Sequence, residues 1–301
     1  MSRIGRTGPE GFLIVSKPYG WTSHDVVAAI RRLTRVRRVG HGGTLDPTAV
    51  GVLVVALGRA TRLLDYPENQ DKCYCGDVVL GAATNTDDSE GTVLYARDPS
   101  GITLDRVVEV LSGFVGEIEQ VPPQFSAVKL QGRKAYEIAR RGGPLELAPR
   151  KVTIKGISVV GWEPPIVSLV ILCSKGTYIR SIARDLGERL GVGAHLGALV
   201  RLANGKFTID DALDIEDVRL AAEFEYLDKL LFPPDEAVAH LPAVVVSPSH
   251  SADMLGGRRW RAREKPGSET ARVYSQDGEF LGLARWESGS WQPSVVFSEG
   301  A

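Results

Sequence analysis

The sequence has little cysteine and no long apolar run. Its 301 residues include only three cysteines, and this odd number argues against a disulfide framework or a zinc site. No stretch approaches the roughly 20 consecutive apolar residues that span a bilayer. Residues 1–9 lack the apolar core of a secretory signal. We therefore expect a cytoplasmic protein that does not enter a membrane.

Internal repeats and low-complexity tracts are also missing. Hydrophobic residues make up 43% of the chain and charged residues 24%, which excludes an intrinsically disordered protein. The length allows one large domain or two smaller ones. Since no feature of the sequence demands a second copy, we expect a monomer.

The net charge of −1 hides an uneven distribution of charge. Residues 209–236 hold ten acidic residues and two basic ones, so this segment carries −8 and the rest of the chain +7. Arginines are concentrated at 31–38 and at 258–265, and arginine suits bidentate contact with phosphate. Either cluster alone is also typical of a solvated basic face. The two together indicate a polyanionic partner such as nucleic acid.

Hydrophobic periodicity predicts the secondary structure of the first 240 residues. Apolar or alternating runs predict strands at 11–15, 73–80, 93–96, 151–160 and 166–173, and the apolar run at 50–57 is expected to be buried. Helical spacing predicts helices at 22–33, 59–66, 103–111, 134–141, 178–190 and 215–232. Residues 40–47 resemble a loop because of their glycines and Pro47.

The composition changes after two adjacent prolines at 233–234 and a third at 242. Short strands are expected beyond this point, at 244–247, 271–274 and 280–284, with Asp277-Gly278 as a hairpin turn. We therefore expect two domains, residues 1–242 and 243–301. The larger one is predicted to be α+β, because its strands form antiparallel-looking pairs without regular βαβ alternation. The smaller one is predicted to be rich in β-structure.

Asp46 is a candidate catalytic residue in the segment His41-Gly-Gly-Thr-Leu-Asp-Pro47. A residue before proline is held extended, and the neighbouring glycines allow a ligand or a backbone to approach closely. The carboxylate could therefore face a cleft. The alternative is an Asx turn, in which the aspartate bonds to its own backbone. Pairing of His41 with His24 or His195 could suggest a metal, but no carboxylate accompanies them at helical spacing, so we expect none.

Arg180 is the second candidate. It lies where the predicted strand at 166–173 leads into a helix, through Ser174-Lys-Gly-Thr-Tyr-Ile-Arg180. A buried arginine at this place needs an anion, and Asp46 is a suitable partner. An oriented, ionised aspartate can act as a nucleophile or a base. The alternative is a surface arginine that pairs with Asp185.

These segments carry a family resemblance. The chain resembles the bacterial TruB-type tRNA pseudouridine-55 synthases over nearly all of residues 11–205. The resemblance rests on Lys17-Pro-x-Gly-x-Thr-Ser, Gly40-His-x-Gly-Thr-Leu-Asp-Pro, Asp71-Lys-x-Tyr74, Thr84-x-Thr-x-Asp88-x-x-Gly91, Pro122–Gly132, Tyr136-Glu-x-Ala-Arg140, Cys173-Ser-Lys-Gly-Thr-Tyr-Ile-Arg180 and Gly193-Ala-His195. It implies a pseudouridine synthase catalytic fold, a mixed and mainly antiparallel sheet with flanking helices. For residues 243–301 it implies a PUA-like RNA-binding domain.

The resemblance also implies residue roles. Asp46 matches the family's nucleophile and Arg180 the arginine that pairs with it. Tyr74 matches the tyrosine that stacks on the target base, and His41 a histidine that helps to hold the flipped nucleotide. Tyr178 and Leu199 match other positions that line the pocket. Phe125 departs from the family pattern, where many members have tyrosine, so a hydroxyl contact to RNA would be missing here.

The partner implied is tRNA, through its T-arm, and no cofactor or metal is implied. Further RNA contacts are expected from basic residues on the flanks of the cleft and in the tail: Lys17, Arg37, Arg38, Lys129, Arg140, Arg258, Arg259 and Arg261. The predicted activity is the isomerisation of uridine 55 in the T-loop. The alternatives are a non-catalytic protein that binds and folds tRNA, and a synthase with a different RNA target.

The implied reaction needs no redox change. The bond between N1 and C1′ of uridine breaks, and the sugar is rejoined through C5. The base must first leave its stack, at a cost of a few kcal/mol. Asp46 would then attack C1′, or remove the C2′ proton to give a glycal, or attack C6 of the ring. The sequence does not separate these routes.

Overall fold

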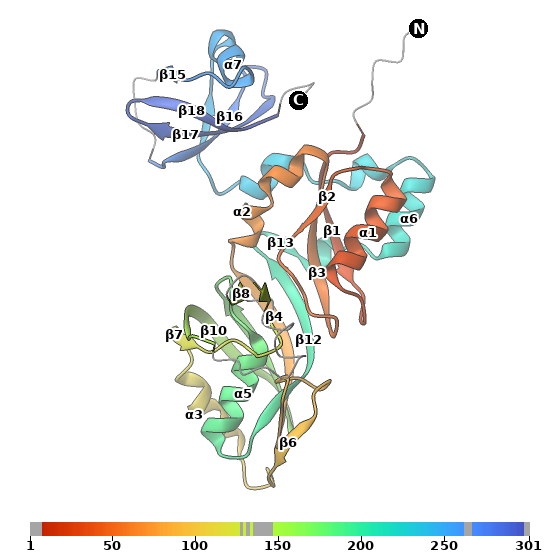
Figure 1. The fold of residues 1–301 in the computed structure, drawn as a ribbon, viewed down its shortest axis with the longest axis vertical. Helices are drawn as coiled ribbons and strands as arrows, with labels where there is room; N and C mark the ends of the chain where they lie inside the picture. The colour runs from red at the N-terminus through yellow and green to blue at the C-terminus, as the bar shows by residue number, and fades with distance from the viewer. Residues whose placement is uncertain (1–7, 127–128, 131–132, 135–146, 262–266, 298–301) are drawn as a thin grey trace.

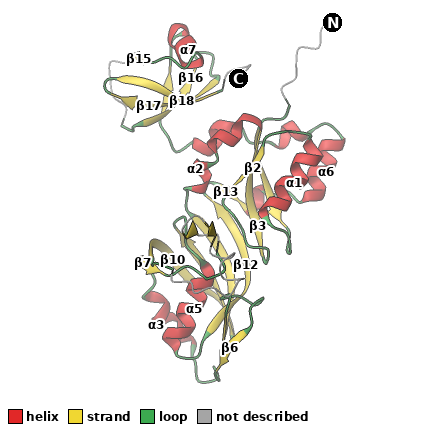
Figure 2. Cartoon of the chain, in the orientation of Figure 1, coloured by secondary structure: helices red, strands yellow, loops and turns green. Residues whose placement is uncertain are grey.

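The computed structural model describes residues 8–126, 129–130, 133–134, 147–261 and 267–297. Figure 1 shows two lobes that share one long sheet, with helices packed beside it, and a smaller sheet that carries the C-terminal part of the chain. The long sheet has nine strands, and seven of them follow the order β1-β3-β12-β4-β11-β10-β7. Figure 2 shows the same arrangement by element type.

The first lobe is built on two apolar strands. β1 (Gly11–Lys17) pairs with β3 (Ala49–Leu57) in antiparallel register, and β2 (Val39–Gly42) pairs with the other edge of β3. α1 (Ser23–Thr34) covers this part of the sheet. Thr22 and Asp25 form the capping box that begins the helix, and Val26 and Ile30 are fully buried.

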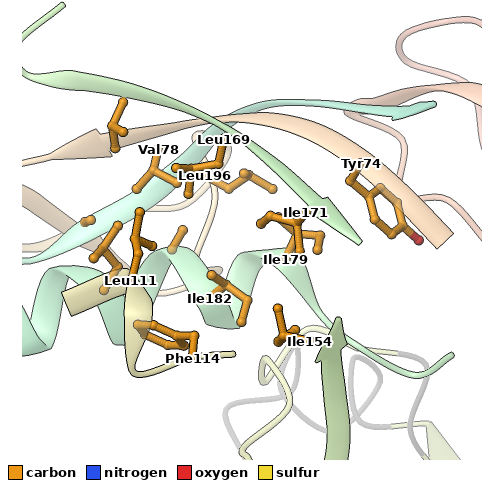
Figure 3. Packing of buried hydrophobic residues seen from close by; sticks show 14 of the residues in the cluster. Tyr74, Val78, Leu111, Phe114, Ile154, Leu169, Ile171, Ile179, Ile182 and Leu196 are labelled. Carbon is orange, nitrogen blue, oxygen red and sulfur yellow. The ribbon is translucent and has the colours of Figure 1, made fainter. Parts of the chain in front are cut away.

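The second lobe is a run of antiparallel strands. β4 (Lys72–Leu80) alternates between buried and half-buried residues. It pairs with β11 (Ile166–Cys173), which pairs on its other edge with β10 (Arg150–Glu163). β10 pairs in turn with β7 (Gly116–Gln120). Helices α3 (Leu104–Ser112) and α5 (Ile179–Leu190) pack on one face. Figure 3 shows the core between them, where Leu111, Phe114 and Ile182 meet Val78 and Leu169.

β12 (Ala194–Asn204) joins the two lobes. It runs parallel to β3 at residues 49–51 and antiparallel to most of β4. The sequence did not predict this strand, because two irregularities in its register disturb the alternation of apolar residues. Its middle therefore lies between the start of β3 on one edge and β4 on the other, and the N-terminus of α5 lines the same cleft as β12.

The C-terminal sheet has five strands in the order β14-β16-β17-β18-β15 and its own apolar core. Its elements are β14 (Ala243–Val245), α7 (Pro248–Leu255), β15 (Trp260–Arg261), β16 (Thr270–Tyr274), β17 (Phe280–Glu287) and β18 (Ser290–Val296). The predicted strands at 244–247, 271–274 and 280–284 correspond to β14, β16 and β17. The sequence did not predict α7, β15 or β18.

The remaining elements are short. They are η1 (Gly58–Leu63), α2 (Asp65–Glu68), β5 (Ala82–Thr84), β6 (Val93–Ala96), β8 (Lys129–Leu130), β9 (Arg133–Lys134), β13 (Phe207–Thr208), η2 (Ile209–Asp211), α6 (Ile215–Glu223), η3 (Leu227–Leu230) and η4 (Pro234–Val238).

The structure confirms the α+β class and corrects several elements. Residues 39–42 form β2, where a loop was predicted, because β3 offers this segment a free edge. β6 pairs with β5, a short strand that the sequence did not predict. The acidic helix ends at Glu223, well before residue 232. Of the helix predicted at 134–141, Lys134 lies in β9 and the rest lies outside the described residues.

Gly51 on β3 lies between Lys17 of β1 and Arg201 of β12. Its φ of +94° is rare for residues with a side chain, and a Cβ atom there would lie 2.4 Å from the carbonyl oxygen of Arg201. We predict that Gly51→Ala lowers the free energy of unfolding by about 2–4 kcal/mol, since backbone strain adds to the clash. Urea unfolding measures the change.

The matched control is Gly156→Ala on β10, where a Cβ atom would meet nothing within 4 Å and φ is not positive. This variant should change the stability by less than about 0.5 kcal/mol. Equal stabilities for the two variants would contradict the strain assigned to Gly51.

Candidate active site

A cleft of about 430 Å³ opens where β12 joins the two lobes. Its walls come from the loop after β2, the start of β4, the N-terminus of α5 and the middle of β12. Five of the residues singled out in the sequence line it: Asp46, Tyr74, Tyr178, Arg180 and Leu199.

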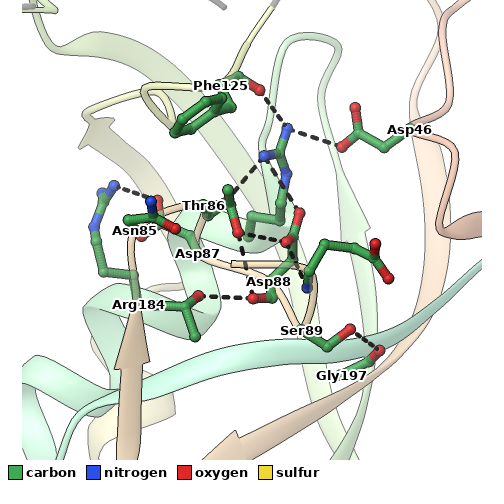
Figure 4. Close-up of polar contacts among 12 residues, drawn as sticks. Asp46, Asn85, Thr86, Asp87, Asp88, Ser89, Phe125, Arg184 and Gly197 are labelled. Carbon is green, nitrogen blue, oxygen red and sulfur yellow. Dashed lines mark hydrogen bonds and ion pairs between the residues drawn. The ribbon is translucent and has the colours of Figure 1, made fainter. Parts of the chain in front are cut away.

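Asp46 and Arg180 form an ion pair at this cleft. An Nη2–Oδ2 distance of 2.9 Å separates them, and 44% of the Asp46 side chain is exposed against 6% of Arg180. Arg180 also donates to the carbonyls of Thr86 and Phe125, each at 3.1 Å, and lies 3.6 Å from a carboxylate oxygen of Asp88 (Figure 4). The buried guanidinium thus orients a carboxylate that remains open to the cleft. Asp185, the alternative partner, pairs with Arg184 instead.

The loop that carries Asp46 is fixed on both sides. Leu45 is buried, its backbone N–H donates to Ser23 Oγ at 2.9 Å, and Ser23 Oγ donates to the Leu45 carbonyl at 3.2 Å. The Asp46 carbonyl accepts a bond from the backbone of Ala49, which begins β3. The loop therefore holds its backbone through other groups, and the Asp46 carboxylate points to Arg180.

Arg201 and Asn204 hold the other end of this loop. Arg201 is 1% exposed and donates to the carbonyls of Val52, Thr44 and Gly43, at 2.6, 3.4 and 3.1 Å. Asn204 is fully buried and donates to the Gly42 carbonyl at 2.9 Å. Sequence analysis missed both residues. The signal was an arginine and an asparagine in an otherwise apolar run, which becomes meaningful only once that run is assigned as a strand.

Lys17 has a different role from the one predicted. Its side chain is fully buried, and Nζ donates to the carbonyls of Trp21, Pro18 and Pro47, at 2.7, 2.9 and 3.2 Å. Burial lowers its pKa to about 8, while the nearby Asp46 acts in the opposite direction. Lys17 therefore ties the Asp46-Pro47 segment to the end of β1. The prediction of a direct RNA contact is wrong, because no part of this side chain reaches the surface.

The two tyrosines form an apolar wall of the cleft. Tyr74 lies on β4 and is 8% exposed, and burial raises its pKa. Tyr178 precedes α5, and Gln120 fixes its backbone by accepting from its N–H at 2.8 Å and donating to its carbonyl at 3.1 Å. Burial raises the pKa of Tyr178 as well. Leu199 faces the cleft from β12, opposite Ala49 and Gly76 in the register. These side chains present aromatic rings and an aliphatic group to the cleft.

His41 does not line this cleft. It lies on β2, and its ring packs edge-on against His24, with 5.4 Å between the ring centroids. Its Nδ1 is buried without a partner among the described residues. Burial, with contributions from His24 and Arg201, lowers its pKa to about 4. The imidazole is therefore neutral near pH 7.

The predicted RNA contacts outside the cleft occupy several surfaces. Arg37 and Arg38 are exposed between α1 and β2. On the C-terminal sheet, Arg258 and Arg259 are exposed, although each pairs with a carboxylate, and Arg261 is exposed on β15. The backbone of Lys129 belongs to β8. Arg140 lies outside the described residues.

The described part of the chain contains no group of three or more His, Cys, Asp and Glu side chains that could hold a metal ion. Cys73, Cys75 and Cys173 are free thiols. No helix within the described ranges is long and apolar enough to cross a membrane. The chemistry available at the cleft is that of an oriented carboxylate beside a buried tyrosine, Tyr74, and a half-buried one, Tyr178.

Comparison with known families gives matches along most of the chain. Residues 31–179 match the TruB family pseudouridylate synthase N-terminal domain. Residues 180–239 match the tRNA pseudouridylate synthase B C-terminal domain, and residues 242–297 match the C-terminal domain of pseudouridine synthase II TruB.

Individual relatives agree with this. The chain is 45% identical over 298 residues to tRNA pseudouridine synthase B of Thermobifida fusca, covering 96% of this chain and 99% of the relative. It is 42% identical over 288 residues to the protein of that name from Dehalococcoides mccartyi, covering 95% and 96%. Among solved structures it is similar to one chain of a Cbf5-Nop10-Gar1 complex, with a TM-score of 0.75, 28% identity, and coverage of 96% of this chain and 85% of that one.

The neutral state of His41 leads to a pH prediction. The pKa of His41 in the folded protein, about 4, is below the ordinary value of 6.5, so the unfolded chain binds more protons than the folded one between these values. The contribution of His41 to stability is therefore lost as the pH falls through this window. We predict that the free energy of unfolding of the wild type, relative to that of His41→Gln, increases from pH 4 to pH 6.5 and is constant above it. Urea unfolding across this range measures the difference.

NMR titration of the His41 ring provides the direct check, with His41→Gln used to assign its resonance. A midpoint close to 4 is expected. A midpoint near the value of free histidine, together with a pH-independent stability difference, would contradict the burial assigned to this side chain.

Proposed function

The chain belongs to the TruB family of pseudouridylate synthases, and we propose that it converts uridine 55 in the T-loop of tRNA into pseudouridine. As a tRNA pseudouridine synthase it is an isomerase, and RNA is its substrate. The observation that best supports the finer proposal is the ion pair between Asp46 and Arg180 at the mouth of a cleft walled by tyrosines.

We propose that the target uridine leaves its stack and enters this cleft. Extrusion of a base costs a few kcal/mol. Stacking on the ring of Tyr74 would offset this by about 1–3 kcal/mol, and Tyr178 and Leu199 would enclose the base from the other sides. A related solved structure, 26% identical with a TM-score of 0.73, is an H/ACA RNP bound to a substrate RNA that contains 2′-deoxyuridine. The substrate RNA in that related structure supports an RNA substrate for this chain.

In the proposed reaction Asp46 acts on the sugar of the bound uridine. Attack on C1′ would displace the uracil through N1, while removal of the C2′ proton would give a glycal. In either route the uracil leaves as an anion and turns within the cleft. In the first route C5 then attacks C1′ and displaces Asp46; in the glycal route C5 bonds to C1′ while Asp46 returns the proton to C2′. The C5 proton is then lost, and N1 gains a proton. Arg180 keeps the carboxylate facing the substrate throughout.

His41 lies outside the lining of the cleft, so its proposed contact is with the RNA around the flipped nucleotide rather than with the base. Arg37 and Arg38 are exposed and lie just before His41 in the sequence, directly before β2. We propose that one copy of the protein binds the T-arm in the cytoplasm through these residues. Residues 243–301 would form a separate PUA-like domain that binds the tRNA backbone away from the target.

We predict that Asp46→Asn abolishes turnover but leaves tRNA affinity within about twofold of the wild type, because the side chain keeps its shape and loses only its charge. The assay uses T-arm RNA tritiated at uracil C5. Tritium is released when C5 replaces N1 as the atom bonded to the sugar. Filter binding measures the affinity, and mapping of the product locates the modified uridine.

The matched control is Asp105→Asn, a change of the same kind on the exposed first turn of α3, which should release tritium at the wild-type rate. Full turnover by Asp46→Asn would reject this residue as the nucleophile. Pseudouridine outside the T-loop would reject position 55 as the target.

A second prediction concerns the C-terminal arginines. Each phosphate contact adds ~0.7–0.9 to the slope of log affinity against log salt. Replacing Arg258, Arg259 and Arg261 by Gln should therefore flatten this slope by about two units and weaken binding, while the rate at saturating enzyme stays the same. Filter binding over a series of salt concentrations measures the slope.

The control replaces Arg106 by Gln on α3, where the exposed arginine pairs with Glu109. This variant should keep the wild-type slope. If the triple variant also keeps it, the C-terminal sheet does not contact the tRNA backbone through these residues.

A further inference from the structure

α5 carries two arginines one helical turn apart. Arg180 and Arg184 stand at positions i and i+4, so their side chains project from the same face of the helix. Both reach the loop between β5 and β6, and both reach the segment that follows β7. Figure 4 shows Arg184 in the network that leads to Asp46.

The contacts of Arg184 parallel those of Arg180. Its Nη1 lies 3.0 Å from Asp87 Oδ2, its Nη2 donates to the Val121 carbonyl at 3.0 Å, and its Nε donates to Asp185 at 2.9 Å. Arg180 reaches the same two segments at Thr86 and Phe125. The two guanidinium groups therefore bridge the same pair of segments, one turn apart.

The loop around Asp87 is held in an unusual conformation. Asp87 has a φ of +62° and is 9% exposed, and a left-handed residue with a side chain needs its surroundings to hold it. Its carbonyl accepts from the backbone of Leu196 on β12, and Thr84 donates through Oγ1 to the carbonyl of Asp88 at 2.7 Å. The ion pair with Arg184 is the charged contact that fixes the Asp87 side chain itself.

We infer that Arg184 is a positioning residue for this reaction. Through Asp87 and the Val121 carbonyl it fixes the two segments whose carbonyls, on Thr86 and Phe125, set the direction of Arg180 and therefore of Asp46. Arg184 acts only through these groups, since it does not line the cleft. The inference rests on the roles proposed above for Asp46 and Arg180.

The charge balance around Asp87 ties this role to pH. The charged groups that face it from α5 are Arg184, Arg180 and Asp185, and Asp88 is its neighbour in the loop. On β12 the nearby titratable residue is His195, whose Nδ1 lies against the Ala82 carbonyl. Residues 121–125 contribute carbonyls to the two arginines. Burial raises the pKa of Asp87 to about 6, more than the two arginines lower it. Protonation would remove the ionic part of the contact.

The test measures the single-turnover rate of tritium release at saturating enzyme, so that differences in tRNA binding do not enter. Arg184→Met should lower this rate roughly ten- to hundredfold, because small misplacements of reacting groups are costly. tRNA affinity should stay within about twofold. Arg184→Lys keeps the charge but only one of the contacts and should recover part of the rate. Asp87→Asn should lower the rate in the same direction.

The pH profile and the double variant separate positioning from folding. The wild-type rate should fall below pH about 6 as Asp87 is protonated, and the Asp87→Asn profile should lack this inflection. The double variant Arg184→Met/Asp87→Asn should be no slower than the slower single variant, since both changes break the same contact, the ion pair between Arg184 and Asp87.

Arg189→Met is the matched control. Arg189 lies on the same helix but contacts the Gly113 carbonyl and the Phe114 ring instead of either of the two bridged segments. The single-turnover rate of Arg189→Met should therefore equal that of the wild type. If Arg184→Met does not fold, Arg184→Lys and Asp87→Asn carry the test. Rates for these variants within about twofold of the wild type, or an unchanged pH profile in Asp87→Asn, would overturn the inference. Asp46→Asn, assayed in parallel, tests the proposed function separately.

Discussion

The site depends on one ion pair, between a carboxylate that is open to solvent and a guanidinium that is not. Arg180 is 6% exposed at its side chain, and a buried cation is costly unless charges and hydrogen bonds surround it. Asp46, Asp88 and two backbone carbonyls supply these. Three segments far apart in the sequence must therefore converge on the first turn of α5. That requirement explains why the loop between β5 and β6 and the segment after β7 both fold back onto this helix.

Buried cations recur around the loop that carries Asp46, and they bond mainly to backbone carbonyls. Lys17 holds the segment after Asp46, and Arg201 holds the segment before it. A carbonyl belongs to the main chain, so a bond to it fixes the position of the loop itself. The arrangement fixes the loop, and Asp46 is the one acidic side chain that faces the cleft among the described residues.

The local parts of this site could be read from the sequence, and the parts made by strand pairing could not. Asp46 was a candidate because a proline follows it and glycines precede it, and Arg180 because a strand runs into a helix there. Arg201 was missed because the bulges of β12 break the alternation that identifies a strand. A lysine that ends a strand gives no sign in the sequence that backbone carbonyls will bury it, as those of Pro18, Trp21 and Pro47 bury Lys17. Only the family resemblance made His41 a candidate for contact with the flipped nucleotide. Its position on β2, paired with β3, places it outside the lining of the cleft.

The charges expected to bind tRNA and the charges that orient the reacting carboxylate lie in different parts of the structure. The acidic residues of 209–236 are concentrated around α6, which packs beside α1, and Arg219 there already pairs with Glu216 and Glu223. Exposed arginines lie instead at 37–38 and on the C-terminal sheet. Contacts between exposed charges and phosphate are screened by salt, whereas the buried pairs on α5 are screened far less. Ionic strength should therefore govern how often tRNA is bound, and the geometry held by Arg180 should govern what happens to the nucleotide in the cleft.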